Sequence, residues 1–205
     1  MRLLAFAFAA ALASTPEVAA ATPPLNLSAL PQRCRAVAMI PPSTRIADPV
    51  LSARVSAAAC VVDPAVAGVP LTDSDASIQA LNSVTAPIIA TLDEVAARGS
   101  LEWKIVALYT KADILFGLQT RLRASLPSVS QDTSLEAAAE IERRQQALDR
   151  KLEPWQNQAA AAFLQVAELA QANPRVANTD PVLQYMVRES IQYTGTPQTP
   201  QRMGE

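Results

Sequence analysis

The sequence predicts an all-α protein, an up-and-down bundle of three long helices and two short ones that follows an extended N-terminal leader. Two observations lead to this fold class. Apolar residues recur every three or four positions over long stretches, which is the spacing of one helix face. The 205-residue chain also holds five glycines, and its strand-forming residues do not alternate with polar ones as they do in half-buried strands.

The first 21 residues have the layout of a secretory signal peptide. Arg2 supplies one positive charge, and the residues from Leu3 to Ala13 form an uncharged apolar run. Ala19 and Ala21 give the small residues of a cleavage site. The apolar run is much shorter than the roughly 20 residues that span a bilayer, and no later apolar segment is expected to be long enough. We therefore expect export to the periplasm or beyond, with no transmembrane segment after cleavage.

Residues 22–47 contain prolines at both ends and no helical period, which predicts an extended, proline-rich leader. The two cysteines of the chain are Cys34, in this leader, and Cys60. In an oxidising compartment an even cysteine count favours a disulfide. The bridge would tie the leader to the following helix and stabilise the fold by roughly 3 to 4 kcal/mol in the chain-entropy model.

The four letters DPVL occur twice, at Asp48 and at Asp180, and we interpret both copies as helix starts. Aspartate is a preferred N-cap, and proline is preferred at the first helical position. The copies predict short helices over 49–62 and 181–193, not a repeated binding motif or a duplicated domain. A related pair, Asp63 and Pro64, is expected to begin a single turn in the same way.

The three long helices are predicted over residues 73–98, 100–126 and 134–172. In each, the apolar seam steps alternately by three and four residues, which favours near-antiparallel packing. Pro87 and Pro154 interrupt two of these helices, but the apolar phase continues through both, so we expect kinks and not breaks. The chain then divides into a signal peptide, a leader, a single helical-bundle domain and a disordered tail, over residues 1–21, 22–47, 48–194 and 195–205.

Charge and composition exclude several classes of function. The 17 basic and 19 acidic residues give a net charge of −2, so no basic excess is available to neutralise phosphates, and we expect no nucleic-acid partner. The chain has no histidine, which excludes Ser-His-Asp and Cys-His catalysis and nearly all zinc sites. No phosphate-binding glycine loop or dinucleotide fingerprint is present. We predict no cofactor and no metal.

Asp113 is the strongest candidate for a small polar pocket. It lies between Tyr109 and Phe116 on a second stripe of the helix over 100–126. Burial would raise the pKa of its carboxyl unless an Arg or Lys partner holds it ionised. The interpretation that we favour is a rim carboxylate or a structural ion pair, with the pocket as the alternative. The candidate cationic partners are Arg121, Arg123 and Lys111.

Gln119 and Gln145 occupy seam positions in otherwise apolar stripes. Polar seam residues commonly fix the register of helix packing, and we interpret both in this way. The alternative is a facing pair that hydrogen-bonds a ligand. The densest charge run, EIERRQQALDRKLE at 140–153, is interpreted as a solvated helix face, with a partner-binding face as the alternative.

These features favour a non-catalytic, exported helical bundle that acts through protein–protein interaction, as an adaptor, a chaperone-like protein or an envelope-associated protein. The expected partner is another envelope or secreted protein, and no oligomeric state is predicted. One alternative is a bundle that binds a small apolar ligand between its helices.

A second alternative is a small exported all-α enzyme that needs no histidine, such as an isomerase similar to secreted chorismate mutases. The stretch IIATLDEVAARGSLEWK has Ile88, Ile89 and Gly99 where that family would present catalytic cations, so we claim no resemblance. An enclosed cavity lined by several cations would favour this alternative. The cations in question are Arg98, Lys104, Arg121, Arg143 and Arg144.

Overall fold

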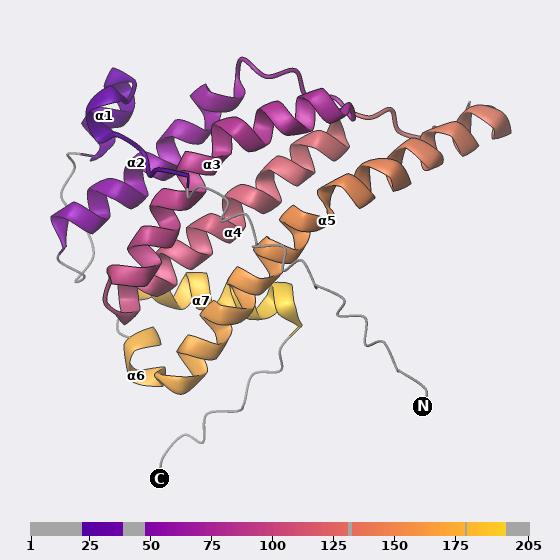
Figure 1. Cartoon of the computed structure of the whole chain (residues 1–205). Helices are drawn as coiled ribbons and strands as arrows, with labels where there is room; N and C mark the ends of the chain where they lie inside the picture. Colours follow the sequence, from indigo (N-terminus) through magenta and orange to yellow (C-terminus); the bar gives the residue numbers. More distant parts are fainter. Residues whose placement is uncertain (1–21, 39–47, 131–132, 179, 196–205) are drawn as a thin grey trace, which may run out of the picture.

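Helices make up all the regular secondary structure in the computed structural model, which describes residues 22–38, 48–130, 133–178 and 180–195 (Figure 1). No strand occurs in these ranges. The predicted fold class, a helical bundle of three long helices with shorter ones, is confirmed. The elements are the 3-10 turn η1 (Leu27–Ala29) and the α-helices α1 (Gln32–Ala38), α2 (Pro49–Val66), α3 (Asp75–Arg98), α4 (Leu101–Ala124), α5 (Leu135–Ala172), α6 (Pro174–Ala177) and α7 (Pro181–Thr194).

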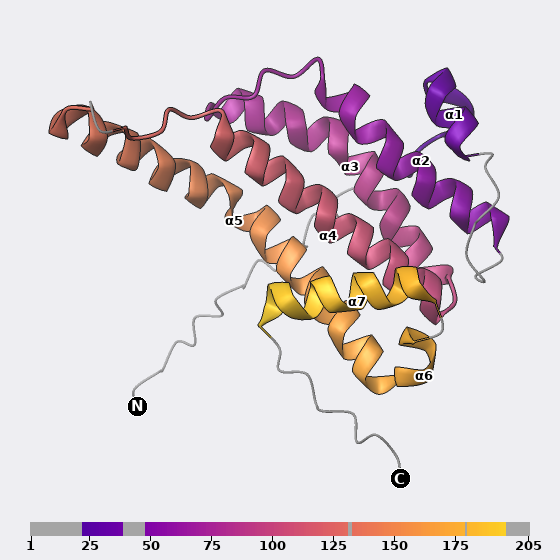
Figure 2. The ribbon, with the colours of Figure 1, turned by 180° about the vertical axis from the view of Figure 1, so that it is seen from behind.

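The long helices α3, α4 and α5 lie side by side in chain order, with α2 against α3 and α7 across α4 and α5 (Figures 1 and 2). Helix α4 is central, because it contacts α2, α3, α5, α6 and α7. Its consecutive residues Ile105, Val106, Ala107 and Leu108 are all buried, which is typical of a helix covered on several sides.

Aspartate begins both helices that follow a DPVL sequence. Asp48 accepts hydrogen bonds from the backbone amides of Val50 and Leu51, each at 3.0 Å. Asp180 accepts one from the amide of Val182 at 2.8 Å. In each helix proline fills the first position, where no amide donor is needed. The predicted helix starts at 49 and 181 are confirmed.

The prediction of a separate turn at Asp63 was wrong. Helix α2 continues to Val66 with Pro64 inside it. Proline removes one amide donor, but continuing the helix buries Val62 and Val66 in the core. Asp63 does not cap a new helix; its carboxylate pairs with Arg121 of α4 at 2.8 Å.

The sequence predicted an extended leader, and this was wrong for part of it, because residues 32–38 form helix α1. Leu30 and Cys34 lie four positions apart and are buried against the body. Two apolar positions are too few to show a helical period in the sequence. Cys34 forms the predicted disulfide with Cys60 of α2. The amide of Leu25 donates to Thr91 Oγ1 of α3 at 2.7 Å. The predicted signal peptide, residues 39–47 and the tail after residue 195 lie outside the described residues.

Helix α2 has the length and apolar composition of a membrane span, although no such segment was expected after the first 21 residues. Its apolar side also faces the bundle, where Val55 and Val61 are buried. The helix carries two charged residues, and both form ion pairs with the neighbouring helices. Arg54 pairs with Glu94 of α3, and Asp63 pairs with α4.

Helix α5 runs unbroken through Pro154, as α3 does through Pro87. Its 38 residues span about 57 Å, because each residue rises about 1.5 Å. The N-terminal end of α5 projects beyond α4 (Figure 1), and Leu148 is the first buried residue of the helix. Leu135, at the projecting end, is 92% exposed.

Candidate functional site

Five aromatic side chains from three helices form one contiguous cluster. Tyr109 lies 5.9 Å from Phe163 and 6.2 Å from Tyr185, measured between ring centroids. Tyr193 lies 5.1 Å from Phe116 and 4.4 Å from Phe163. Three of these four pairs meet edge to face, a favoured arrangement of aromatic rings. The cluster joins the exposed side of α4 to that of α7, with a ring of α5 beneath.

Two rows of side chains lie next to each other across this cluster. The row on α4 consists of Tyr109, Asp113 and Phe116, and the row on α7 consists of Tyr185, Glu189 and Tyr193. Because neighbours in each row are three or four residues apart, each row follows one helix face. Tyr109 contacts Tyr185 at the N-terminal end of both rows, and Phe116 contacts Tyr193 at the C-terminal end. Helices α4 and α7 therefore run in the same general direction here (Figure 2). A carboxylate from each helix lies between the two aromatic pairs. We call this surface the aromatic–acidic band: Tyr109, Asp113 and Phe116 of α4, with Tyr185, Glu189 and Tyr193 of α7.

Helix α7 presents its row outwards because the opposite side holds it to the core. Leu183 is fully buried, and Met186 and Val187 pack against the core cluster. Phe163 of α5, which is 5% exposed, forms the floor of the band. The side chains above it remain partly open to solvent. Phe116 is 39% exposed, Tyr185 48% and Tyr193 41%.

The electrostatics of the band are dominated by burial and by unpaired negative charge. Burial raises the pKa of the Tyr109 hydroxyl, and so do a hydrogen bond with Tyr185 and the nearby carboxylates of Asp113 and Glu189. Asp113 is exposed on its outer side, yet the packed neighbours remove enough water to raise the pKa of its carboxyl as well. Within the described ranges neither carboxylate takes part in an ion pair.

Arg121 does not complete the pocket that the sequence suggested. It follows Asp113 by two helical turns, roughly 12 Å along the axis, and it pairs with Asp63. The other two candidate cations are also engaged elsewhere. Lys111 pairs with Asp93, and Arg123 pairs with Asp149. Tyr109 and Asp113 do lie together, but their neighbours come from α7 and not from the basic residues of α4.

The two seam glutamines are not a facing pair. Gln119 is 1% exposed, and its Nε2 has no hydrogen-bond partner among the described residues. Gln145 is exposed and precedes Leu148, the first buried residue of α5. Its predicted register role was therefore wrong, whereas Gln119 does occupy the interior of the bundle.

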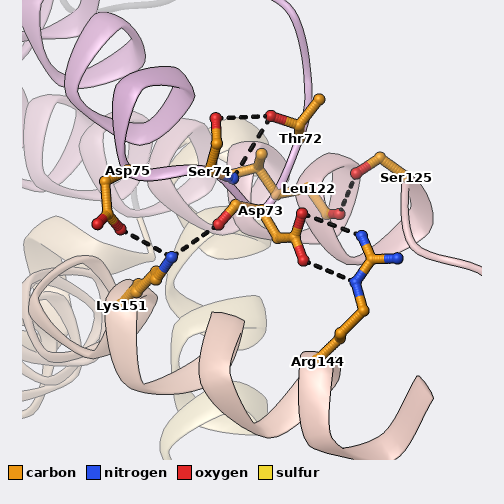
Figure 3. A network of polar contacts seen from close by, with 8 residues as sticks. All are labelled: Thr72, Asp73, Ser74, Asp75, Leu122, Ser125, Arg144 and Lys151. Carbon is orange, nitrogen blue, oxygen red and sulfur yellow. Dashed lines mark hydrogen bonds and ion pairs between the residues drawn. The ribbon is translucent and has the colours of Figure 1, made fainter. Parts of the chain in front are cut away.

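The charge run of α5 is more than a solvated face, because two of its cations hold the N-terminal end of α3 (Figure 3). The guanidinium of Arg144 donates to both carboxylate oxygens of Asp73, at 2.9 and 3.0 Å. This contact lowers the pKa of the Asp73 carboxyl. Lys151 Nζ pairs with Asp75 at 2.7 Å and donates to the backbone carbonyl of Asp73 at 2.8 Å. The network fixes α5 just where its projecting part begins.

The arginines that would have favoured an enzyme are distributed over the surface. Each pairs with a different carboxylate: Arg98 with Glu94, Arg121 with Asp63, Arg143 with Glu140 and Arg144 with Asp73. They do not converge on a shared anion site. The described residues also include no group of metal-binding side chains.

Known proteins offer no further guide to this surface. The chain matches none of the family models, curated proteins or solved structures with which it was compared.

Proposed function

We propose that this protein is an exported, non-catalytic helical bundle that acts by binding another envelope or secreted protein through the aromatic–acidic band. The observation that carries the proposal is the exposure of Phe116, Tyr185 and Tyr193 on one continuous surface. Large aromatic side chains contribute most where a partner covers them, and they are enriched in protein interfaces.

The sequence and the disulfide support export. The first 21 residues have the pattern of a signal peptide. The disulfide between Cys34 and Cys60 suits an oxidising compartment, where such bonds persist. The complete absence of histidine removes the most common general base at neutral pH and so favours binding over catalysis.

Affinity purification from the envelope fraction after chemical crosslinking tests this function. We expect a defined partner protein to copurify with the parent chain and to be lost when Tyr185 and Tyr193 are replaced by serine. Gln79→Ser, at an exposed position of α3, is the matched control and should retain the partner. Recovery of the same proteins with all three chains, or retention of the protein in the cytoplasm, would contradict the proposal.

A further inference from the structure

The two carboxylates of the band, exposed Asp113 and half-buried Glu189, form no ion pair with any described residue. Asp113 and Glu189 both lie near the Tyr109 hydroxyl, between the Tyr109–Tyr185 pair and the Phe116–Tyr193 pair. Arg188 is the cation nearest in sequence on α7, and it lies over the Tyr185 ring with 5.7 Å between its guanidinium carbon and the ring centroid. Two carboxylates flanked by aromatic rings match a partner's cation, because such a cation gains both ionic and cation–π contacts.

Gly117 adds an independent observation at the edge of the band. It lies inside α4, one turn after Asp113 and next to Phe116. Glycine inside a helix costs roughly 1 kcal/mol relative to alanine. A Cβ atom at this position would meet nothing within 4 Å, so no contact within the bundle requires glycine here. A partner that approaches the backbone of α4 closely would account for it.

We propose that the aromatic–acidic band docks an amphipathic helix of the partner protein, with an Arg or Lys side chain seated between the two aromatic pairs and the helix backbone passing close to Gly117. The inference rests on the proposed function and specifies the chemistry of the partner. The guanidinium or ammonium group neutralises Asp113 and Glu189, and the apolar side of the helix covers the rings of Phe116 and Tyr193. Charge complementarity selects a basic helix over an acidic one.

A second copy of this chain is the alternative occupant. Eight of its arginines and lysines form ion pairs within the bundle that would have to break to supply a cation. Arg33, Arg35 and Arg150, however, are exposed and take part in none of these pairs. Self-association is therefore an outcome that the experiment must distinguish. It would appear as changes in the band signals when the protein is concentrated without any peptide.

The experiment titrates the purified protein with two synthetic helical peptides and follows its backbone amide signals by NMR. One peptide has a leucine face flanked by arginines, and the other has glutamate in place of each arginine. We expect the arginine peptide to shift the signals of α4 and α7 around Tyr109, Gly117 and Glu189 in a saturable way. The glutamate peptide should bind about tenfold more weakly or not at all, and added salt should weaken the arginine complex.

Variants locate the contact. Asp113→Asn combined with Glu189→Gln should weaken the arginine peptide about tenfold, as expected when a charge-assisted contact is lost. Glu136→Gln combined with Glu142→Gln removes the same charge from the projecting part of α5 and should leave affinity unchanged. Gly117→Ala should also weaken binding, although it stabilises the free protein.

The inference is overturned by equal binding of both peptides, by shifts confined to other helices, by self-association through the band, or by no saturable binding at millimolar peptide. These results are distinct from failure of the proposed function. A partner that copurifies with the parent chain and depends on Tyr185 and Tyr193, yet is unaffected by the change at Asp113 and Glu189, would leave the function standing and remove only the basic helix.

Discussion

Replacing Gly117 with alanine should stabilise the protein, whereas the same substitution at Gly99 should destabilise it. At Gly117 the added Cβ meets no atom within 4 Å, so the gain is the difference in helix propensity, about 0.8 to 1 kcal/mol. At Gly99 the Cβ would lie 2.7 Å from Trp103 Cβ and 2.8 Å from the Val95 carbonyl oxygen. Neither atom is the flexible end of a side chain, so overpacking should cost about 1 to 3 kcal/mol.

Urea unfolding followed by far-UV circular dichroism measures both changes, with the parent chain in the same buffer. The midpoint should move in opposite directions for the two variants while the slope stays constant, because the buried surface is unchanged. A gain of 1 kcal/mol at Gly117 corresponds to a rise in Tm of about 2 to 4 °C for a chain of this size. A loss of stability with Gly117→Ala, or a gain with Gly99→Ala, would contradict the open surroundings of Gly117 and the close packing around Gly99.

Three further changes test the core, the disulfide and the band. Gln119→Leu removes a buried Nε2 that has no partner and should raise the free energy of unfolding by about 1 to 3 kcal/mol in the same urea assay; a loss would show that the amide is satisfied. Replacing Cys34 and Cys60 by serine opens a loop with a sequence separation of 26 and should cost about 3.5 kcal/mol, and an unchanged Tm would contradict this. Asp113→Asn should stabilise the protein at about pH 7 but not at about pH 3. The folded state holds the Asp113 proton more tightly than the unfolded state, so the parent loses stability as pH rises from the ordinary pKa of 3.8 through the raised value. Thermal unfolding of both chains across this range measures the difference, and a constant difference would exclude the raised pKa.

Helix starts were predictable because their chemistry is local. The carboxylates of Asp48 and Asp180 bond to amides two or three residues ahead, and each proline follows directly in the chain. The continuation of α2 through Pro64 was not predictable in this way. It depends on Val62 and Val66 reaching a core that other helices form.

The band could be predicted only in part. The positions of Tyr109, Asp113 and Phe116 on one stripe of α4 are visible from their spacing. The matching row of α7 also shows as tyrosine, glutamate and tyrosine at intervals of four, but nothing local places that row beside α4. Gln145 illustrates the same limit, because the seam pattern of α5 continues past the end of its partner helix.

Site-specific photocrosslinking in the exporting cell tests the central claim most directly. A photoreactive phenylalanine derivative would replace Tyr185 in the band and, as the control, Gln79 on α3. We predict one defined adduct at position 185 that is strong relative to position 79 and that weakens when Asp113 and Glu189 are made neutral. Adducts of equal strength at both positions, or none at position 185, would contradict an interaction surface on α4 and α7.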